Sequence, residues 1–151
     1  MKRLVPIGLL FAAVAARAEI PKEFDACTVF TPADAAQALG ETPRELPPPK
    51  TKNKVIPACT YESGEGPSTK SLSVQFRFAK NDDEARRAFS EARLEARGKP
   101  VILGGRDAYW LDKQAQLNVL KGSHWVVITA KVPGRESDTA RKLAEILLPK
   151  I

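Results

Sequence analysis

Cys27 and Cys59 are the first residues whose chemistry follows from their type and spacing. They are the only two cysteines, and they lie 32 positions apart. In an oxidising compartment, such a pair is the natural source of a disulfide. The alternatives are a metal site and a reactive thiol, but two distant cysteines and a single histidine make a poor metal set. We predict a Cys27–Cys59 disulfide, no metal site and no cofactor.

His124 is the only histidine, so any hydrolytic triad must use it. A Ser-His-Asp arrangement needs a hydroxyl and a carboxylate beside the ring, and Ser123 is the sequence neighbour. Both residues lie at the tip of a predicted strand hairpin, where a solvent-facing position is the simpler interpretation. No glycine-rich phosphate-binding motif is present either. We predict no catalytic residues and no enzymatic activity, and the alternative is a small hydrolase-like enzyme that uses His124.

The best candidate for a binding site follows the pair Gly104-Gly105. Two glycines let the backbone turn tightly, and the arginine after them offers a forked donor for an anion. Aromatic side chains close by can form the wall of a ligand site. The alternative is a structural turn in which the aspartate satisfies backbone donors and an aromatic ring packs in the core. The candidate binding residues are Arg106, Asp107, Tyr109 and Trp110.

A second candidate surface is the segment 41–57, which combines five prolines with four basic residues. Its proline triplet favours an extended polyproline II conformation. We call this segment the basic flap, and its candidate residues are Lys50, Lys52 and Lys54. They can meet an anionic partner, such as a lipid head group or an acidic protein, or they can simply be solvated. A structural envelope factor that acts through the basic flap is a further alternative for the function.

Residues 1–18 have the pattern of a secretory signal peptide. A short basic start precedes an apolar run that ends in the small-x-small cleavage pattern Ala16-Arg17-Ala18. The run is shorter than the roughly 20 residues that span a bilayer, which disfavours a membrane anchor. No lipidation signal directly precedes Cys27. We expect a signal peptide at 1–18 and one domain at 19–151, which is periplasmic or secreted.

The charge of the exported chain argues against a nucleic-acid partner. The full sequence has a net charge of +6, from 24 basic and 18 acidic residues. Lys2, Arg3 and Arg17 leave with the signal peptide, so the exported chain is only mildly basic. Nucleic-acid-binding domains usually concentrate a larger positive charge on one face. The expected partner is an envelope protein or a small ligand.

Three helices are predicted. Thr31 is an N-cap for a helix over 32–39, with Pro32 at its first position and Gly40 as its stop. Asn81 caps the second helix, which ends at Gly98. The third runs over about 137–148. Charged side chains cover the outer face of the second helix, where weak, solvated ion pairs are the simplest interpretation; they include Arg86, Arg87 and Arg93.

Strands are predicted where apolar and polar residues alternate. Residues 58–63 form one strand, and 71–78 form the clearest one. Residues 116–120 and 124–132 form a hairpin, preceded by a segment over 106–111. The strand at 124–132 is apolar on both faces, which indicates a central strand covered on both sides. The predicted fold class is therefore α+β, an antiparallel sheet of about five strands with three helices in the order α-β-β-α-β-β-β-α and one disulfide.

Several short motifs follow one another in a characteristic order. A cysteine precedes Thr31-Pro32-Ala33-Asp34-Ala35-Ala36, a glycine ends that helix, a second cysteine precedes Thr60-Tyr61, and a Gly-Gly-Arg-Asp-Ala-Tyr-Trp segment comes before the hairpin. This pattern resembles a family of exported bacterial domains of unknown function. Many members are lipoproteins, whereas this chain lacks the lipidation signal. The resemblance implies no catalytic residues, and the layout is also similar, at the level of fold alone, to PsbP-like sandwiches.

Taken with the predicted export, these features lead us to expect a non-enzymatic binding or interaction domain.

Overall fold

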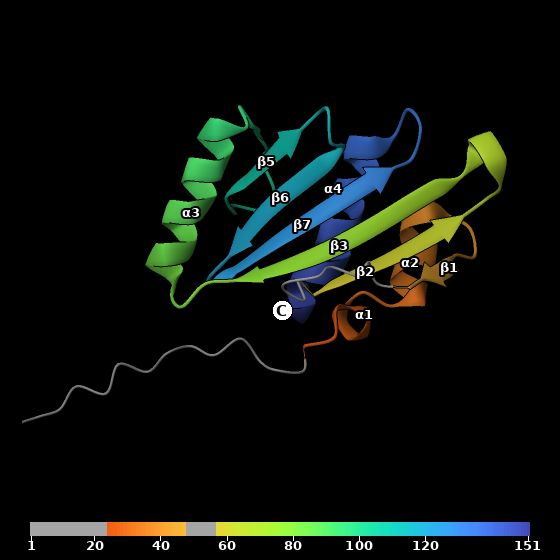
Figure 1. Ribbon diagram of the computed structural model, residues 1–151, viewed down its shortest axis with the longest axis horizontal. Coiled ribbons are helices and arrows are strands. Elements are labelled where there is room, and N and C mark those ends of the chain that lie inside the picture. Colours follow the sequence, from red (N-terminus) through yellow and green to blue (C-terminus); the bar gives the residue numbers. More distant parts are fainter. Residues whose placement is uncertain (1–23, 48–56) are drawn as a thin grey trace, which may run out of the picture.

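The computed structural model describes residues 24–47 and 57–151. Within them, the chain forms one sheet of seven strands and four α-helices (Figure 1). The predicted signal peptide lies outside the described residues, and so do Lys50, Lys52 and Lys54 of the basic flap. Both therefore stay predictions. No helix in the described ranges is long and apolar enough to cross a membrane.

The sheet is antiparallel throughout, with the strand order β1-β2-β3-β7-β6-β5-β4. β7 is the central strand, as its apolar pattern predicted. The strands are β1 Arg44–Leu46, β2 Ala58–Ser63, β3 Lys70–Phe78, β4 Lys99–Pro100, β5 Ala108–Leu111, β6 Gln116–Lys121 and β7 His124–Lys131. The helices are α1 Ala26–Val29, α2 Pro32–Leu39, α3 Asp82–Glu95 and α4 Glu136–Leu147.

The α+β class and the antiparallel sheet are confirmed, but the prediction of about five strands and three helices was wrong. The described residues add β1, β4 and α1, which have three, two and four residues. Elements this short span about one period of a helix or strand pattern, so alternation cannot identify them. β1 and β4 are the two edges of the sheet, and short edge strands limit edge-to-edge association.

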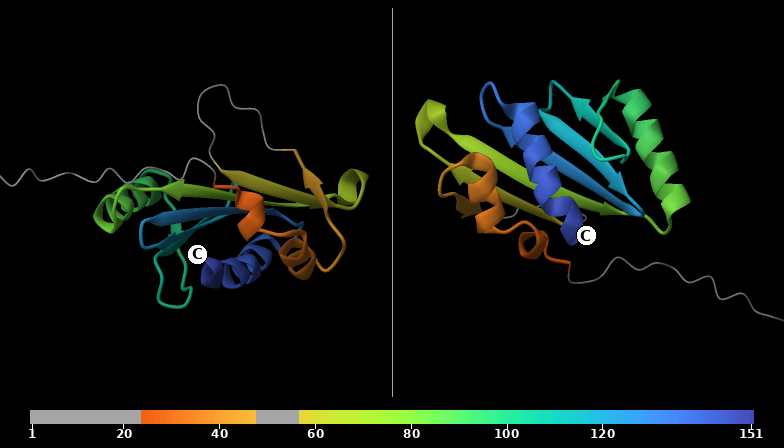
Figure 2. Two further views of the ribbon diagram at one scale, coloured as in Figure 1. Left: turned by 90° about the horizontal axis from the view of Figure 1, so that it is seen from below. Right: turned by 180° about the vertical axis from the view of Figure 1, so that it is seen from behind.

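The sheet has two different faces. Figure 2 shows α1, α2 and α4 together on one side, where they cover the main hydrophobic core. α3 packs near one end of the sheet against residues of the other face, in a second, smaller cluster. The main core includes Tyr61, Leu72, Val74, Phe76, Leu117, Val119, Val126, Ile128, Leu143 and Leu147, each at most 1% exposed.

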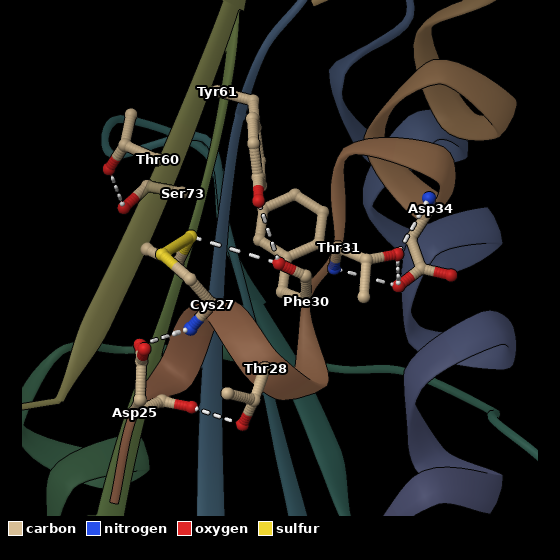
Figure 3. Close-up of a disulfide and its surroundings, with 10 residues drawn as sticks. Asp25, Cys27, Thr28, Phe30, Thr31, Asp34, Thr60, Tyr61 and Ser73 are labelled. Carbon is tan, nitrogen blue, oxygen red and sulfur yellow. Dashed lines mark hydrogen bonds between the residues drawn. A yellow bond between two sulfur atoms is a disulfide. The ribbon is translucent and has the colours of Figure 1, made fainter. Parts of the chain in front are cut away.

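The predicted disulfide is confirmed. Cys27, in α1, is bonded to Cys59, in β2, and their Cα atoms lie 5.1 Å apart (Figure 3). Beside it, the Tyr61 hydroxyl donates a hydrogen bond of 3.1 Å to the Phe30 carbonyl, and the two rings meet edge to face. This corner fixes the start of the described chain to β2.

The start of α2 is held by a capping box. The Thr31 hydroxyl accepts a hydrogen bond from the Asp34 N–H, and the Asp34 carboxylate accepts one from the Thr31 N–H. Gly40 ends the helix in the left-handed conformation, as predicted. The Lys150 ammonium also donates to Asp34, at 2.6 Å, so the end of the chain is tied to this helix.

Candidate functional site

The predicted turn is the tip of a hairpin that joins β4 to β5. Gly104 and Gly105 have φ of 55° and 73°, and the Arg106 N–H donates to the Leu103 carbonyl at 3.1 Å. Positive φ at both central residues is what a type I′ turn requires, and glycine adopts it without strain. The turn places Arg106 and Asp107 directly before β5, at the end of the sheet that α3 covers.

α3 turns one row of side chains toward this hairpin. Asp82, Arg86, Phe89, Ser90 and Arg93 follow the spacing of one helical face. Phe89 fixes the rotation of the helix, because its ring is buried against Tyr109 with the ring centroids 4.8 Å apart. The arginines on either side of Phe89 along the helix therefore border the space between α3 and the hairpin.

Two adjoining hollows of about 270 Å³ each occupy this space. Arg86, Arg106 and Asp107 border both hollows, and Arg93 borders the second. Phe89 and Ala108 contribute apolar surface to the second hollow, next to the guanidinium groups. We call this continuous surface the arginine groove, defined by Arg86, Arg93, Arg106 and Asp107 over Phe89 and Ala108.

Within the described residues, the guanidinium groups of the arginine groove are at most weakly paired with carboxylates. Arg86 reaches Asp83 only at 4.0 Å, and both side chains are mainly exposed, so this pair contributes little. Among residues 24–47 and 57–151, Arg93 and Arg106 have no ion pair and no side-chain hydrogen bond. Lys121 also borders the first hollow, but its ammonium donates to the Leu148 carbonyl at 2.6 Å. The groove can therefore supply forked donors to an incoming anion.

Tyr109 supports the groove from below. It is 2% exposed, and burial raises the pKa of its phenol, so the ring is neutral at physiological pH. Gly98, just after α3, faces this ring so closely that a Cβ atom there would overlap it. Tyr109 thus fixes the distance between α3 and β5, and its ring belongs to the smaller core cluster.

Trp110 borders neither hollow of the arginine groove. Its ring packs at the edge of the main core, and its Nε1 donates to the Asp112 carboxylate at 2.9 Å. Neighbouring residues of a strand point to opposite faces, so Tyr109 and Trp110 do not share one ligand wall. Of the four predicted residues, the structure brings together only Arg106 and Asp107.

Sequence reasoning did not find Arg86 and Arg93, which were interpreted as part of a solvated helix face. The sequence pattern that could have identified them is their spacing from Phe89, the large buried apolar residue of α3. Arg86 lies three residues before it and Arg93 four residues after it, so all three share one helical face. Because most other positions of the helix are also charged, this spacing does not stand out in the sequence. Arg87, the next residue along, borders neither hollow and serves as a natural control.

Within the described residues, His124 lies beside an aromatic ring. Its ring meets Phe78 edge to face, with centroids 5.2 Å apart. In the part of the chain that the structure describes, its side chain has no hydrogen bond to a hydroxyl or a carboxylate. The same part contains no cluster of three or more potential metal ligands among His, Cys, Asp and Glu. The hydrolase alternative gains no support from this geometry.

A third, more apolar hollow of about 200 Å³ lies on the other flank of α3, beside Trp125. The Arg77 guanidinium covers the Trp125 ring at 4.6 Å from its centre, and the indole N–H donates to Asn118 at 3.0 Å. The indole therefore already makes one cation–π contact and one N–H hydrogen bond within the protein. The arginine groove is therefore the stronger candidate site.

Comparison with known proteins adds no functional information. No protein-family model, no curated protein and no solved structure matches this chain.

Proposed function

We propose that this protein is an exported, non-enzymatic interaction domain that binds an anionic group of its partner in the arginine groove. The observation that carries the proposal is the convergence of guanidinium groups from two elements distant in sequence. Arg86 and Arg93 come from α3 and Arg106 from the hairpin, and all three border one apolar-floored surface. Paired arginines of this kind suit carboxylate and phosphate groups because the guanidinium fork matches two oxygen atoms.

The proposed compartment outside the cytoplasm rests on two features. The sequence of residues 1–18 predicts export, and the chain contains a disulfide. Disulfides of this kind persist in oxidising compartments such as the bacterial periplasm. The basic flap is a separate candidate surface, and its role stays a prediction.

The test is to follow the arginine side chains of the ¹⁵N-labelled exported protein by NMR while anionic probes are added. Suitable probes are inorganic phosphate, citrate and a tri-glutamate peptide, with a tri-lysine peptide as the cationic control. At least one anion should shift the Nε–Hε signals of Arg86, Arg93 and Arg106 and leave Arg87 unchanged. Higher salt should weaken the effect, because screening acts on exposed charges.

Either of two results would reject this function. The first is that no anion shifts the three groove signals. The second is that Arg87 moves as much as Arg86, which would indicate general ionic screening of the helix instead of a site.

A further inference from the structure

We propose that the anionic group bound in the arginine groove belongs to an extended peptide segment that carries carboxylate side chains beside apolar ones. This inference rests on the proposed function, and it selects one class of partner among the possible anions. Four observations of the groove favour it: its charge balance, the state of the helix terminus beside it, its apolar lining and its shape.

The charge balance fits a singly charged carboxylate better than a phosphate. Asp107 borders both hollows and Asp82 borders the first, beside three arginines and Lys121, whose ammonium is held by the Leu148 carbonyl. A phosphate monoester carries about −1.5 to −2 charges at neutral pH, so these carboxylates would repel it more strongly. Asp107 also has no side-chain partner in the described ranges, which leaves its oxygen atoms available to accept from the amides of a peptide.

The start of α3 is already closed to an anion. Helix N-termini commonly bind phosphate through free N–H groups. Here the Asn81 side chain accepts from the Glu84 N–H at 2.8 Å. Asp82, Asp83 and Glu84 then place three negative charges in the first turn. The anion must therefore be held by the guanidinium groups farther along α3 and on the hairpin.

The lining of the second hollow favours a ligand that has apolar groups next to its carboxylate. Phe89, Pro100, Val101 and Ala108 border it together with the arginines. A strongly hydrated ion gains nothing from such surface, whereas an aliphatic side chain gains free energy when it covers it. An acidic residue followed or preceded by an apolar one satisfies both parts of the lining.

The shape favours a chain over a small molecule. The hollows adjoin along α3 from Asp82 to Arg93, eleven helical positions or about 16 Å, which equals about five residues of extended chain. Each hollow alone, at about 270 Å³, is smaller than the roughly 300–1,000 Å³ typical of small-molecule sites, so an occupant that fills the groove must extend along both. A peptide of five or six residues can use both hollows at once.

The segment is recognised by its side chains and does not add a strand to the sheet. The nearest edge, β4, contains Pro100, which has no N–H to donate. Just beyond β4, the Ile102 carbonyl accepts a hydrogen bond from Arg141 at 3.3 Å. Strand addition needs free backbone donors and acceptors along the edge, so this edge is poorly suited to it.

Fluorescence anisotropy on the exported protein tests the inference with three labelled hexapeptides. The first alternates glutamate and leucine, the second replaces glutamate by glutamine, and the third replaces leucine by serine. The glutamate–leucine peptide should bind at least fivefold more tightly than either of the others. Arg86→Ala and Arg106→Ala should each weaken its binding at least fivefold, whereas the matched variant Arg87→Ala should leave it unchanged.

Inorganic phosphate and vesicles of phosphatidylcholine with phosphatidylglycerol are the competing probes. If either binds in an Arg86-dependent manner and the glutamate–leucine peptide does not, the peptide inference is overturned while the anion-binding function stands. Equal binding of the serine peptide would overturn the apolar part of the inference. If no probe depends on Arg86 or Arg106, both the inference and the proposed function are wrong.

Discussion

The residue that best shows how local geometry shapes the arginine groove is Gly98. The sequence indicated this glycine as the helix stop, where a left-handed conformation is expected. In the structure that conformation belongs to Arg97, with φ of 54°, and the Gly98 N–H donates to the Arg93 carbonyl at 2.8 Å. Gly98 is needed because the Tyr109 ring leaves no space for a side chain. Sequence alone located the end of α3 but could not show this ring contact between distant segments.

Neighbouring substitutions at this point should change stability in opposite directions. Gly98→Ala should lower the free energy of unfolding by about 1–3 kcal/mol, the usual cost of overpacking. Arg97→Gly should raise it by roughly 0.5–1 kcal/mol, because glycine adopts positive φ without the strain of a side chain. Urea unfolding measures both. A neutral Gly98→Ala variant would mean that Tyr109 does not fix the spacing between α3 and β5.

Asp34 links the pH dependence of stability to α2. Burial alone would raise the pKa of its carboxyl, but hydrogen bonds from Lys150 and Thr31 outweigh burial and lower the pKa below its ordinary value. The unfolded chain therefore binds the proton more tightly. The contribution of Asp34 is complete above the unfolded pKa of about 4 and is lost as the pH falls through the lower pKa of the folded state.

Asp34→Asn should lower the free energy of unfolding at pH 7 by about 1 kcal/mol, the usual value of a helix cap. The difference between wild type and variant should shrink as the pH falls below about 4, where the wild-type carboxylate becomes protonated. Urea unfolding at pH 7, 5 and 3 gives this comparison. A difference that stays constant with pH would show that the carboxylate charge is not what stabilises α2.

At the scale of elements, length determined what the sequence could predict. β2, β3, β6, β7 and the three longer helices all have clear periodic patterns, and all were predicted within a few residues of their bounds. α1, β1 and β4 are too short to show a pattern, and each is held by contacts with distant segments. α1 is the extreme case, since a single helical turn is unstable alone and is joined to β2 by the disulfide.

Loss of the disulfide should therefore destabilise the protein more than loss of the hydrogen bond beside it. Cys59→Ala should lower the free energy of unfolding by about 2–5 kcal/mol. Tyr61→Phe, which removes only the hydrogen bond to the Phe30 carbonyl, should cost about 1 kcal/mol. Chemical unfolding under non-reducing conditions measures both, and an equal cost for the two variants would contradict this order.

At the scale of the whole molecule, the two faces of the sheet are covered to different extents. One face is fully engaged in the main core with α1, α2 and α4, while α3 covers only one end of the other face. The arginine groove lies where α3 meets the β4–β5 hairpin, and its arginines come from segments that are distant in the sequence. Sequence reasoning could identify Arg106 and Asp107 from a local motif. It could not identify their partners on α3, because only the fold brings the two segments together.

The most direct test of the account is a double-mutant cycle on the arginine groove. Binding of the glutamate–leucine peptide is measured for wild type, Arg86→Ala, Arg106→Ala and the double variant. A control cycle uses Arg87→Ala in place of Arg86→Ala. If α3 and the hairpin form one site, the first pair should be coupled by more than about 0.5 kcal/mol and the control pair should be additive. Additive losses in both cycles, or no loss in either single variant, would contradict the assignment of the groove as the binding site.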